Sequence, residues 1–245
     1  MINLKNYIIE SIFDIEDNID NVDESIKYRI KQFLNDNFKN ASKFKISEKP
    51  NKDGKFEVSS NSDVIVKNKQ ITSLTNGSFI WTNIKGNFNC SECNLLTSLE
   101  GAPKKVGGSF FCDQCNILTS LEGAPEKVGA DFYCNNCKSL TSLEGAPEEV
   151  GYFCCNYCTS LTSLKGAPKE VRSCFYCDHC NSLKSLDGAP EKIGADFYCN
   201  YCKSLTSLAG ASKEVGGAFC CEDCGSKFTQ EDVQKVSNVK GTIDV

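Results

Sequence analysis

The chain has 245 residues, a formal net charge of −5 and 24% charged residues. The length allows a sizeable core, and the acidic balance argues against general binding of nucleic acid or anionic membranes, which select basic surfaces. No apolar run approaches the ~18 residues that cross a bilayer, and the N-terminus lacks the basic start and apolar core of a signal peptide. We therefore expect a cytoplasmic protein without nucleic-acid or membrane partners, whose seventeen cysteines stay reduced.

Residues 1–40 predict an N-terminal helical cap. Two sets of apolar residues recur at helical spacing: Leu4, Ile8, Ile12 and Ile15, then Ile26, Ile30, Phe33, Leu34 and Phe38. The segment Asp20–Asp23 between them predicts a turn, so we expect a small helical hairpin whose apolar stripes pack on each other or cover the first coil. Its acidic outer face is a second candidate surface for a partner.

Residues 41–57 are rich in Lys, Ser, Asn and Gly, and their composition is typical of a linker or exposed loop. After this segment, Val64, Val66 and Ile71 indicate a degenerate first coil of a repeat array. We place the repeat domain at residues 58–225.

The repeat domain contains seven CxxC pairs that follow one another at a period of 22 residues, once 21. A fixed period of this length indicates a solenoid, in which each repeat forms one coil. The pairs are Cys90/Cys93, Cys112/Cys115, Cys134/Cys137, Cys155/Cys158, Cys177/Cys180, Cys199/Cys202 and Cys221/Cys224.

Other apolar positions recur with the same period. A representative unit, Leu118 to Ser139, is LTSLEGAPEKVGADFYCNNCKS. Phe stands two residues before the first cysteine, and Leu stands three and six residues after the second. The F-x-C segment has the period of two typical of a strand with one buried face, and Gly-Ala-Pro marks a turn. We expect one short strand per unit and an irregular return, with strands stacked in parallel.

Residues 226–245 predict a C-terminal cap. The repeat pattern stops where Lys227 replaces the expected leucine. Thr229 and Asp232 have the spacing of a capping box, and Phe228 and Val233 that of a hydrophobic staple, so a short helix follows. We expect residues 239–245 to add a final strand.

The unit resembles the leucine-rich repeat. The segment VGGSFFCDQCNIL is similar to the family pattern LxxLxLxxNxL, with Phe110 and Cys112 at buried strand positions and Cys115 at the asparagine position. LTSLEGAP is similar to a stretch of short bacterial effector repeats, and CxxLTSL to repeats of bacterial surface proteins and of phages of gut bacteria. The resemblance implies a leucine-rich-repeat-like solenoid of bacterial or phage origin that acts as a binding scaffold.

The CxxC pairs have two interpretations. Cys112/Cys115 and Cys134/Cys137 have a spacing that matches a zinc site. The same spacing equals the repeat length, and the cysteines fall where the repeat places its core, where a thiol acts as a small hydrophobe. In that position the second cysteine can also donate to loop carbonyls. We favour the core and assign no metal ligands and no cofactor, with a thiolate zinc protein as the alternative.

Alternation along the strand predicts an outward face rich in aromatic and acidic residues. Tyrosine is common on solvated strands for its strand propensity alone, but it is also enriched where proteins bind one another. The acidic flanks favour a basic partner. The candidate partner-binding residues are Phe111, Asp131, Tyr133, Tyr152, Tyr157, Tyr176, Asp178, Asp196, Tyr198 and Tyr201. Cys154, Cys174 and Cys220 fall on the same face and are expected to be exposed.

These patterns predict a monomeric, non-catalytic protein-binding scaffold. His179 is the single histidine, which removes most nucleophile–base arrangements, and the segments APKK, APEK, APEE and APKE predict a solvated edge of mixed charge. A structural or virion-associated component remains a further alternative.

Overall fold

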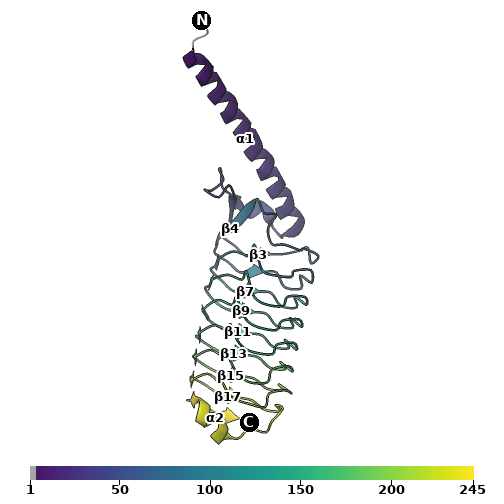
Figure 1. Ribbon diagram of the computed structural model, residues 1–245, viewed down its shortest axis with the longest axis vertical. Helices are drawn as coiled ribbons and strands as arrows, with labels where there is room; N and C mark the ends of the chain where they lie inside the picture. Colours follow the sequence, from purple (N-terminus) through teal and green to yellow (C-terminus); the bar gives the residue numbers. More distant parts are fainter. Residues whose placement is uncertain (1–3) are drawn as a thin grey trace.

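The computed structural model describes the backbone of residues 4–245 and the side chains of residues 21–245. Most of the chain forms a straight column of coils, with helix α1 (Leu4–Asn37) at one end and helix α2 (Gln230–Val236) at the other (Figure 1). A 3-10 turn, η1 (Ala41–Lys43), follows α1. The predicted repeat solenoid with helical caps is confirmed.

Each complete coil contributes two short strands rather than the single strand expected from the sequence. The strand with the F-x-C pattern joins a nine-stranded sheet, which is parallel throughout. Its members are β3 (Val64–Ile65), β5 (Phe88–Asn89), β7 (Phe110–Phe111), β9 (Phe132–Tyr133), β11 (Phe153–Cys154), β13 (Phe175–Tyr176), β15 (Phe197–Tyr198), β17 (Phe219–Cys220) and β19 (Ile243–Asp244).

In the regular coils the second strand is the dipeptide that follows Gly-Ala-Pro, or Gly-Ala-Ser in the last of them, and one further residue. Together with longer strands in the first coils and one strand at each end, these dipeptides form two five-stranded sheets. The second strand arises because the backbone of each dipeptide meets its equivalent in the next coil. The first sheet contains β1 (Lys45–Ile46), β2 (Phe56–Ser60), β4 (Phe79–Ile84), β6 (Lys105–Val106) and β8 (Lys127–Val128). The second contains β10 (Glu149–Val150), β12 (Glu170–Val171), β14 (Lys192–Ile193), β16 (Glu214–Val215) and β18 (Asn238–Val239).

The core is a set of identical side chains stacked from coil to coil. The rings of Phe132 and Phe153 lie 5.3 Å apart and nearly parallel, and those of Phe153 and Phe175 lie 5.4 Å apart. The repeated leucines are buried beside them. Removal of one such Phe side chain would cost about 3–5 kcal/mol, because neighbouring coils cannot close the cavity.

The CxxC cysteines belong to this core. All are free thiols, and all are buried except Cys224, which is half-buried at the C-terminal end. The second cysteine of a pair lies within hydrogen-bond distance of the carbonyl of the first cysteine one coil earlier: Cys115 Sγ lies 3.4 Å from Cys90 O, and Cys137 Sγ 3.2 Å from Cys112 O. The expected thiol donors to loop carbonyls are confirmed.

Helix α1 is continuous, in place of the expected hairpin. Asp20–Asp23 lie within the helix, because this segment contains neither the Gly nor the Pro that would end it. Ile30, Leu34 and Phe38 are buried, and the Phe38 ring packs edge-on against Trp81 at 5.1 Å. The C-terminal half therefore covers the first coil as expected, while the N-terminal half extends past it (Figure 1). The predicted stripe of Leu4, Ile8, Ile12 and Ile15 lies outside the side chains that the structure describes.

The segment expected as a linker contains η1, β1 and the first residues of β2. Strand β1 pairs antiparallel with β2, so this segment closes the N-terminal end of the first five-stranded sheet. At the same end of the nine-stranded sheet, Phe38 forms an antiparallel bridge with Val66.

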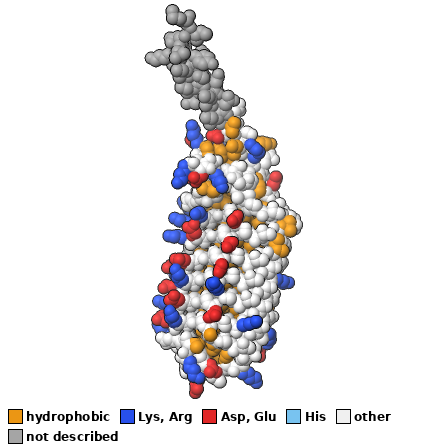
Figure 2. Space-filling model, in the orientation of Figure 1, with side chains coloured by type: hydrophobic (Ala, Val, Ile, Leu, Met, Phe, Trp, Pro, Cys, Tyr) orange, Lys and Arg blue, Asp and Glu red, His pale blue; other side chains and the backbone are white. Residues whose placement is uncertain are grey.

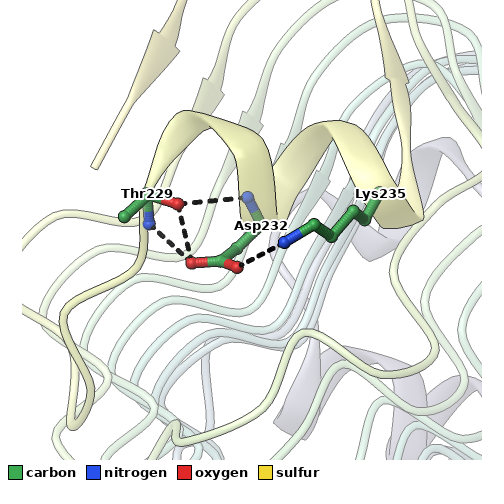
Figure 3. A network of polar contacts seen from close by, with 3 residues as sticks. All are labelled: Thr229, Asp232 and Lys235. Atoms are coloured by element: carbon green, nitrogen blue, oxygen red, sulfur yellow. Dashed lines mark hydrogen bonds and ion pairs between the residues drawn. The ribbon is translucent and has the colours of Figure 1, made fainter.

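The C-terminal cap has the predicted capping box (Figure 3). The Asp232 backbone N–H donates to Thr229 Oγ1 at 3.2 Å, and Asp232 Oδ2 accepts the Thr229 N–H at 3.1 Å. The Thr229 hydroxyl also donates to Asp232 Oδ2 at 2.8 Å, and this hydrogen bond, with the one from the Thr229 N–H, lowers the pKa of the Asp232 carboxyl. Val233 is the buried residue of α2. The expected final strand is present as β19, preceded by β18.

The buried thiols predict a fold that is sensitive to alkali. Burial raises the pKa of Cys93 to about 11 and that of Cys154 and Cys220 to about 12. In the unfolded chain thiols ionise near pH 8.5. The contribution of these thiols to stability is therefore complete below about pH 8.5 and falls as pH rises toward the folded pKa, by up to about 1.4 kcal/mol per pH unit for each thiol whose pKa is raised.

Thermal unfolding measured in reductant between about pH 7 and pH 10 should show a steep fall in Tm above about pH 8.5. A double variant, Cys154→Ala with Cys220→Ala, should show a shallower fall. A Tm that stays level over this range would contradict the assignment of protonated core thiols.

Candidate protein-interaction face

The outward side of the nine-stranded sheet carries a central aromatic column. Phe111 pairs in register with Tyr133, and Tyr176 with Tyr198. The two rings of each pair lie parallel, with centroids 4.8 Å and 4.9 Å apart. These four side chains are partly exposed. Because the ring faces cover one another along the column, the outer surface consists of ring edges and tyrosine hydroxyls.

Cys154 interrupts this column between Tyr133 and Tyr176. The predicted exposure of Cys154, Cys174 and Cys220 is wrong, since their exposed fractions are 8%, 6% and 7%. A thiol is much shorter than the tyrosine rings beside it, so neighbouring side chains cover it. Two of these thiols also face carboxylates: Cys174 Sγ lies 3.7 Å from Asp196 Oδ2, and Cys220 Sγ 3.5 Å from Asp244 Oδ2.

Three residues at the corner after the strand form a second aromatic row. Tyr157, His179 and Tyr201 occupy the third position of successive CxxC motifs, where the backbone is left-handed with φ near 60°. The His179 ring is stacked between the two tyrosines, 4.3 Å from Tyr157 and 4.7 Å from Tyr201. Tyr157 and Tyr201 have exposed fractions of 46% and 39%. His179 was not among the predicted binding residues, although its place in the motif matches that of both tyrosines.

Tyr152 provides the remaining exposed ring. Its exposed fraction is 38%, and its ring lies 6.5 Å from that of Tyr176. It stands in the coil that carries Cys154, directly before Phe153. The seven aromatic candidates therefore all lie on this face or its corner: four in the central column, Tyr152 beside it, and Tyr157 and Tyr201 in the corner row.

The three acidic candidates have a structural role in addition to their charge. Asp178 Oδ1 accepts the Asn200 backbone N–H at 2.7 Å, and Asp196 Oδ1 accepts that of Ala218 at 2.8 Å. Asp131 Oδ1 accepts the Tyr152 N–H at 2.9 Å. Each carboxylate thus binds the backbone of the next coil and joins two coils together.

Equivalent positions in other coils make the same hydrogen bond with Asn. Asn156 Oδ1 accepts the Asp178 N–H at 2.8 Å, and Asn200 Oδ1 accepts that of Glu222 at 2.8 Å. The alternation of the sequence predicts these polar residues beside the strand, but it does not reveal that their oxygens accept hydrogen bonds from the neighbouring coil.

The electrostatics of the face follow from this packing. Partial burial raises the pKa of Asp178. Burial and the nearby carboxylates Asp131 and Asp196 raise the pKa of Tyr133 and of Tyr198 to about 12. Each of these hydroxyls lies 3.3 Å from the carboxylate two residues before it and donates to it. These two hydroxyls therefore stay protonated at neutral pH.

Within the part of the chain whose side chains are described, no group of three or more His, Cys, Asp or Glu residues is arranged to hold a metal ion. In that same part, no helix has the length and apolar character needed to cross a membrane. No family model matches the chain, and no curated protein and no solved structure shows significant similarity to it.

The hydrogen bond from the Asn200 N–H to Asp178 Oδ1 can be tested by substitution of Asp178. Replacement by Ala leaves the Asn200 N–H without its acceptor, which should lower the free energy of unfolding by about 1–3 kcal/mol. Replacement by Asn keeps an oxygen at the same place and should cost much less. Urea denaturation of the two variants measures the difference. Equal stability of Asp178→Ala and the wild type would show that this carboxylate does not join the coils.

Proposed function

We propose that the protein is a non-catalytic scaffold that binds a protein partner through the outward face of the nine-stranded sheet. The observation that carries the proposal is the ordered aromatic surface, in which stacked rings from five successive coils, Phe111 to Tyr201, lie on one side of a rigid sheet. Neighbouring coils of a parallel sheet are about 4.8 Å apart, so the surface extends over roughly 20 Å. This length suits a folded partner better than a small molecule.

The chemistry of the exposed rings favours a protein. Tyrosine combines a large apolar area with a hydroxyl, and it loses little conformational entropy when it is immobilised. Here stacking already holds the rings in place, so little further ordering opposes binding. Tyr152, Tyr157 and Tyr201 are the most exposed of the set and would contribute most of the contact area.

The charges on this face favour a basic partner. The segments SFFCDQ, DFYCNN, YFCCNY, CFYCDH, DFYCNY and AFCCED contribute this face from residue 109 to residue 223, and they contain six carboxylates and neither Lys nor Arg. Carboxylates gathered on one face attract the cationic side chains of a partner.

The thiols support a role without catalysis. A reactive cysteine needs a lowered pKa, whereas burial raises the pKa of Cys112, Cys134 and Cys155 well above the usual range. The single histidine is stacked between two tyrosines. The seventeen free thiols also favour the reducing cytoplasm that the composition suggests.

Kinship with leucine-rich repeats is part of the same proposal. It is supported by the second cysteine of the six pairs after the first, whose thiol contacts a carbonyl of the neighbouring coil at the place where the family has asparagine. Bacterial or phage origin is proposed on the sequence resemblance alone.

The test compares two faces of the same solenoid. A triple variant, Tyr152→Ala, Tyr157→Ala and Tyr201→Ala, should lose at least about tenfold in affinity for the partner, since removing hot-spot residues costs 1–2 kcal/mol or more each. The matched control replaces exposed Thr119, Thr141 and Thr162 by Ala on a different side. The partner is first captured by photo-crosslinking from Tyr157, and its affinity is then measured by calorimetry. Equal affinity of the tyrosine variant and the control would place binding elsewhere.

A further inference from the structure

The charged dipeptide ladder on the other side of each coil is interrupted once, between β8 and β10. The coil at this point has two residues between Val150 and Phe153, where its neighbours have three between the equivalent residues. As a result, the Gly151 N–H donates to Ala130 O at 2.6 Å, whereas the Gly129 N–H in the regular coil before it donates to Val106 O at 2.9 Å. The missing residue displaces the strand and separates the two five-stranded sheets.

Arg172 lies at this break. Its position is held by glycine in the regular coils, for example Gly129 and Gly194, because a side chain there would collide with the previous coil. The shortened coil leaves room for the arginine, whose Nη2 donates to Gly129 O at 3.1 Å across two coils. An open groove of about 1210 Å³ crosses the break, and Lys127, Glu149 and Arg172 contribute to its lining.

The outward charges on the two sides of the break are arranged in like-signed pairs. Lys105 lies directly opposite Lys127 in the ladder, and Glu149 lies directly opposite Glu170. All four side chains are exposed. Like charges on facing positions of adjacent strands are destabilising. Among the residues with described side chains, none of the four has an ion-pair partner.

The adjacent column of the same edge is neutralised within the chain. Lys104 pairs with Glu126 at 3.0 Å, Lys169 with Glu148 at 3.0 Å, and Lys213 with Glu191 at 3.4 Å. Figure 2 shows charged side chains of both signs gathered along one long side of the solenoid. The order of two lysines followed by two glutamates, centred on the break, is therefore unlike its surroundings.

We propose that this charged face pairs with the same face of a second copy of the chain, in an antiparallel dimer with its two-fold axis at the break. A two-fold interface is formed by one patch that is complementary to itself. Around an axis between Lys127 and Glu149, Lys127 of one copy meets Glu149 of the other, and Lys105 meets Glu170. In the adjacent column the same axis brings Glu126 towards Glu148 and Lys104 towards Lys169, but each of these charges is already neutralised by an ion pair within its own chain. Four ion pairs then form between the two copies, and they offset the repulsion between Lys105 and Lys127 and between Glu149 and Glu170 within each chain.

Only the antiparallel arrangement has this property. A parallel pairing in the same register places lysine against lysine and glutamate against glutamate. The antiparallel dimer is closed, so it does not extend into a filament. It replaces the monomer expected from the sequence, because the pairing of like charges appears only when the coils are stacked in register. It leaves the aromatic face of the nine-stranded sheet free.

The test reverses the charge of either the two lysines or the two glutamates. Sedimentation velocity should show a dimer of the full chain at low ionic strength that dissociates at about 1 M salt, where the Debye length is about 3 Å. Lys105→Glu with Lys127→Glu makes all four positions acidic, and Glu149→Lys with Glu170→Lys makes all four basic. Each double variant should be monomeric alone, and an equimolar mixture should form a heterodimer. The variant with all four changes is again complementary to itself and should dimerise like the wild type.

The matched control exchanges Lys192 and Glu214, which occupy the same column outside the four residues, and it should dimerise normally. The mixing experiment does not depend on the stability of one variant, because each double variant must bind the other in order to dimerise. A wild-type monomer at low salt, double variants that dimerise alone, a mixture without heterodimer, or loss of the dimer in the control would each overturn the proposal.

Discussion

The structure depends on hydrogen bonds between the backbones of successive coils. In a parallel stack each coil must present its N–H and C=O groups where the next coil presents the complementary groups, so every coil must have nearly the same length and path. The chain meets this condition with a period of 22 residues. Once the backbones are in register, each sequence position becomes a column of side chains, and a residue is surrounded mainly by its own equivalents.

Because each residue is surrounded by its own equivalents, all members of one column have the same structural role. Phe, Leu and the two cysteines point inward and form a dry core, where burial raises the pKa of thiols such as Cys112 and Cys134. Asp and Asn beside the nine-stranded sheet accept the N–H groups of the next coil and so join the coils from outside. Tyrosines are held edge-outward by their stacked neighbours. An ordered aromatic surface is thus a consequence of the repeat, and stacking between coils holds its rings in place.

The single shortened coil shows what a departure from the period does. One missing residue before Phe153 leaves the nine-stranded sheet intact, because Phe153 still pairs with Phe132 and Phe175. The same deletion divides the other ladder, since the change lies next to Val150. The irregularity is therefore confined to one edge, where it allows a side chain at Arg172 and separates two blocks of opposite charge.

The sequence by itself determined the period, the inward columns, the caps at both ends and the aromatic content of the outward face, because these follow from spacing and polarity within each repeat. Tertiary structure alone decided which outward residues are accessible. Cys154 is covered because tall rings flank it in adjacent coils, Asp178 accepts a hydrogen bond because the next coil places an N–H there, and Lys105 lies beside Lys127 because the stack brings them into register. Contacts between residues 22 positions apart depend on how coils stack, and local sequence patterns do not contain that information.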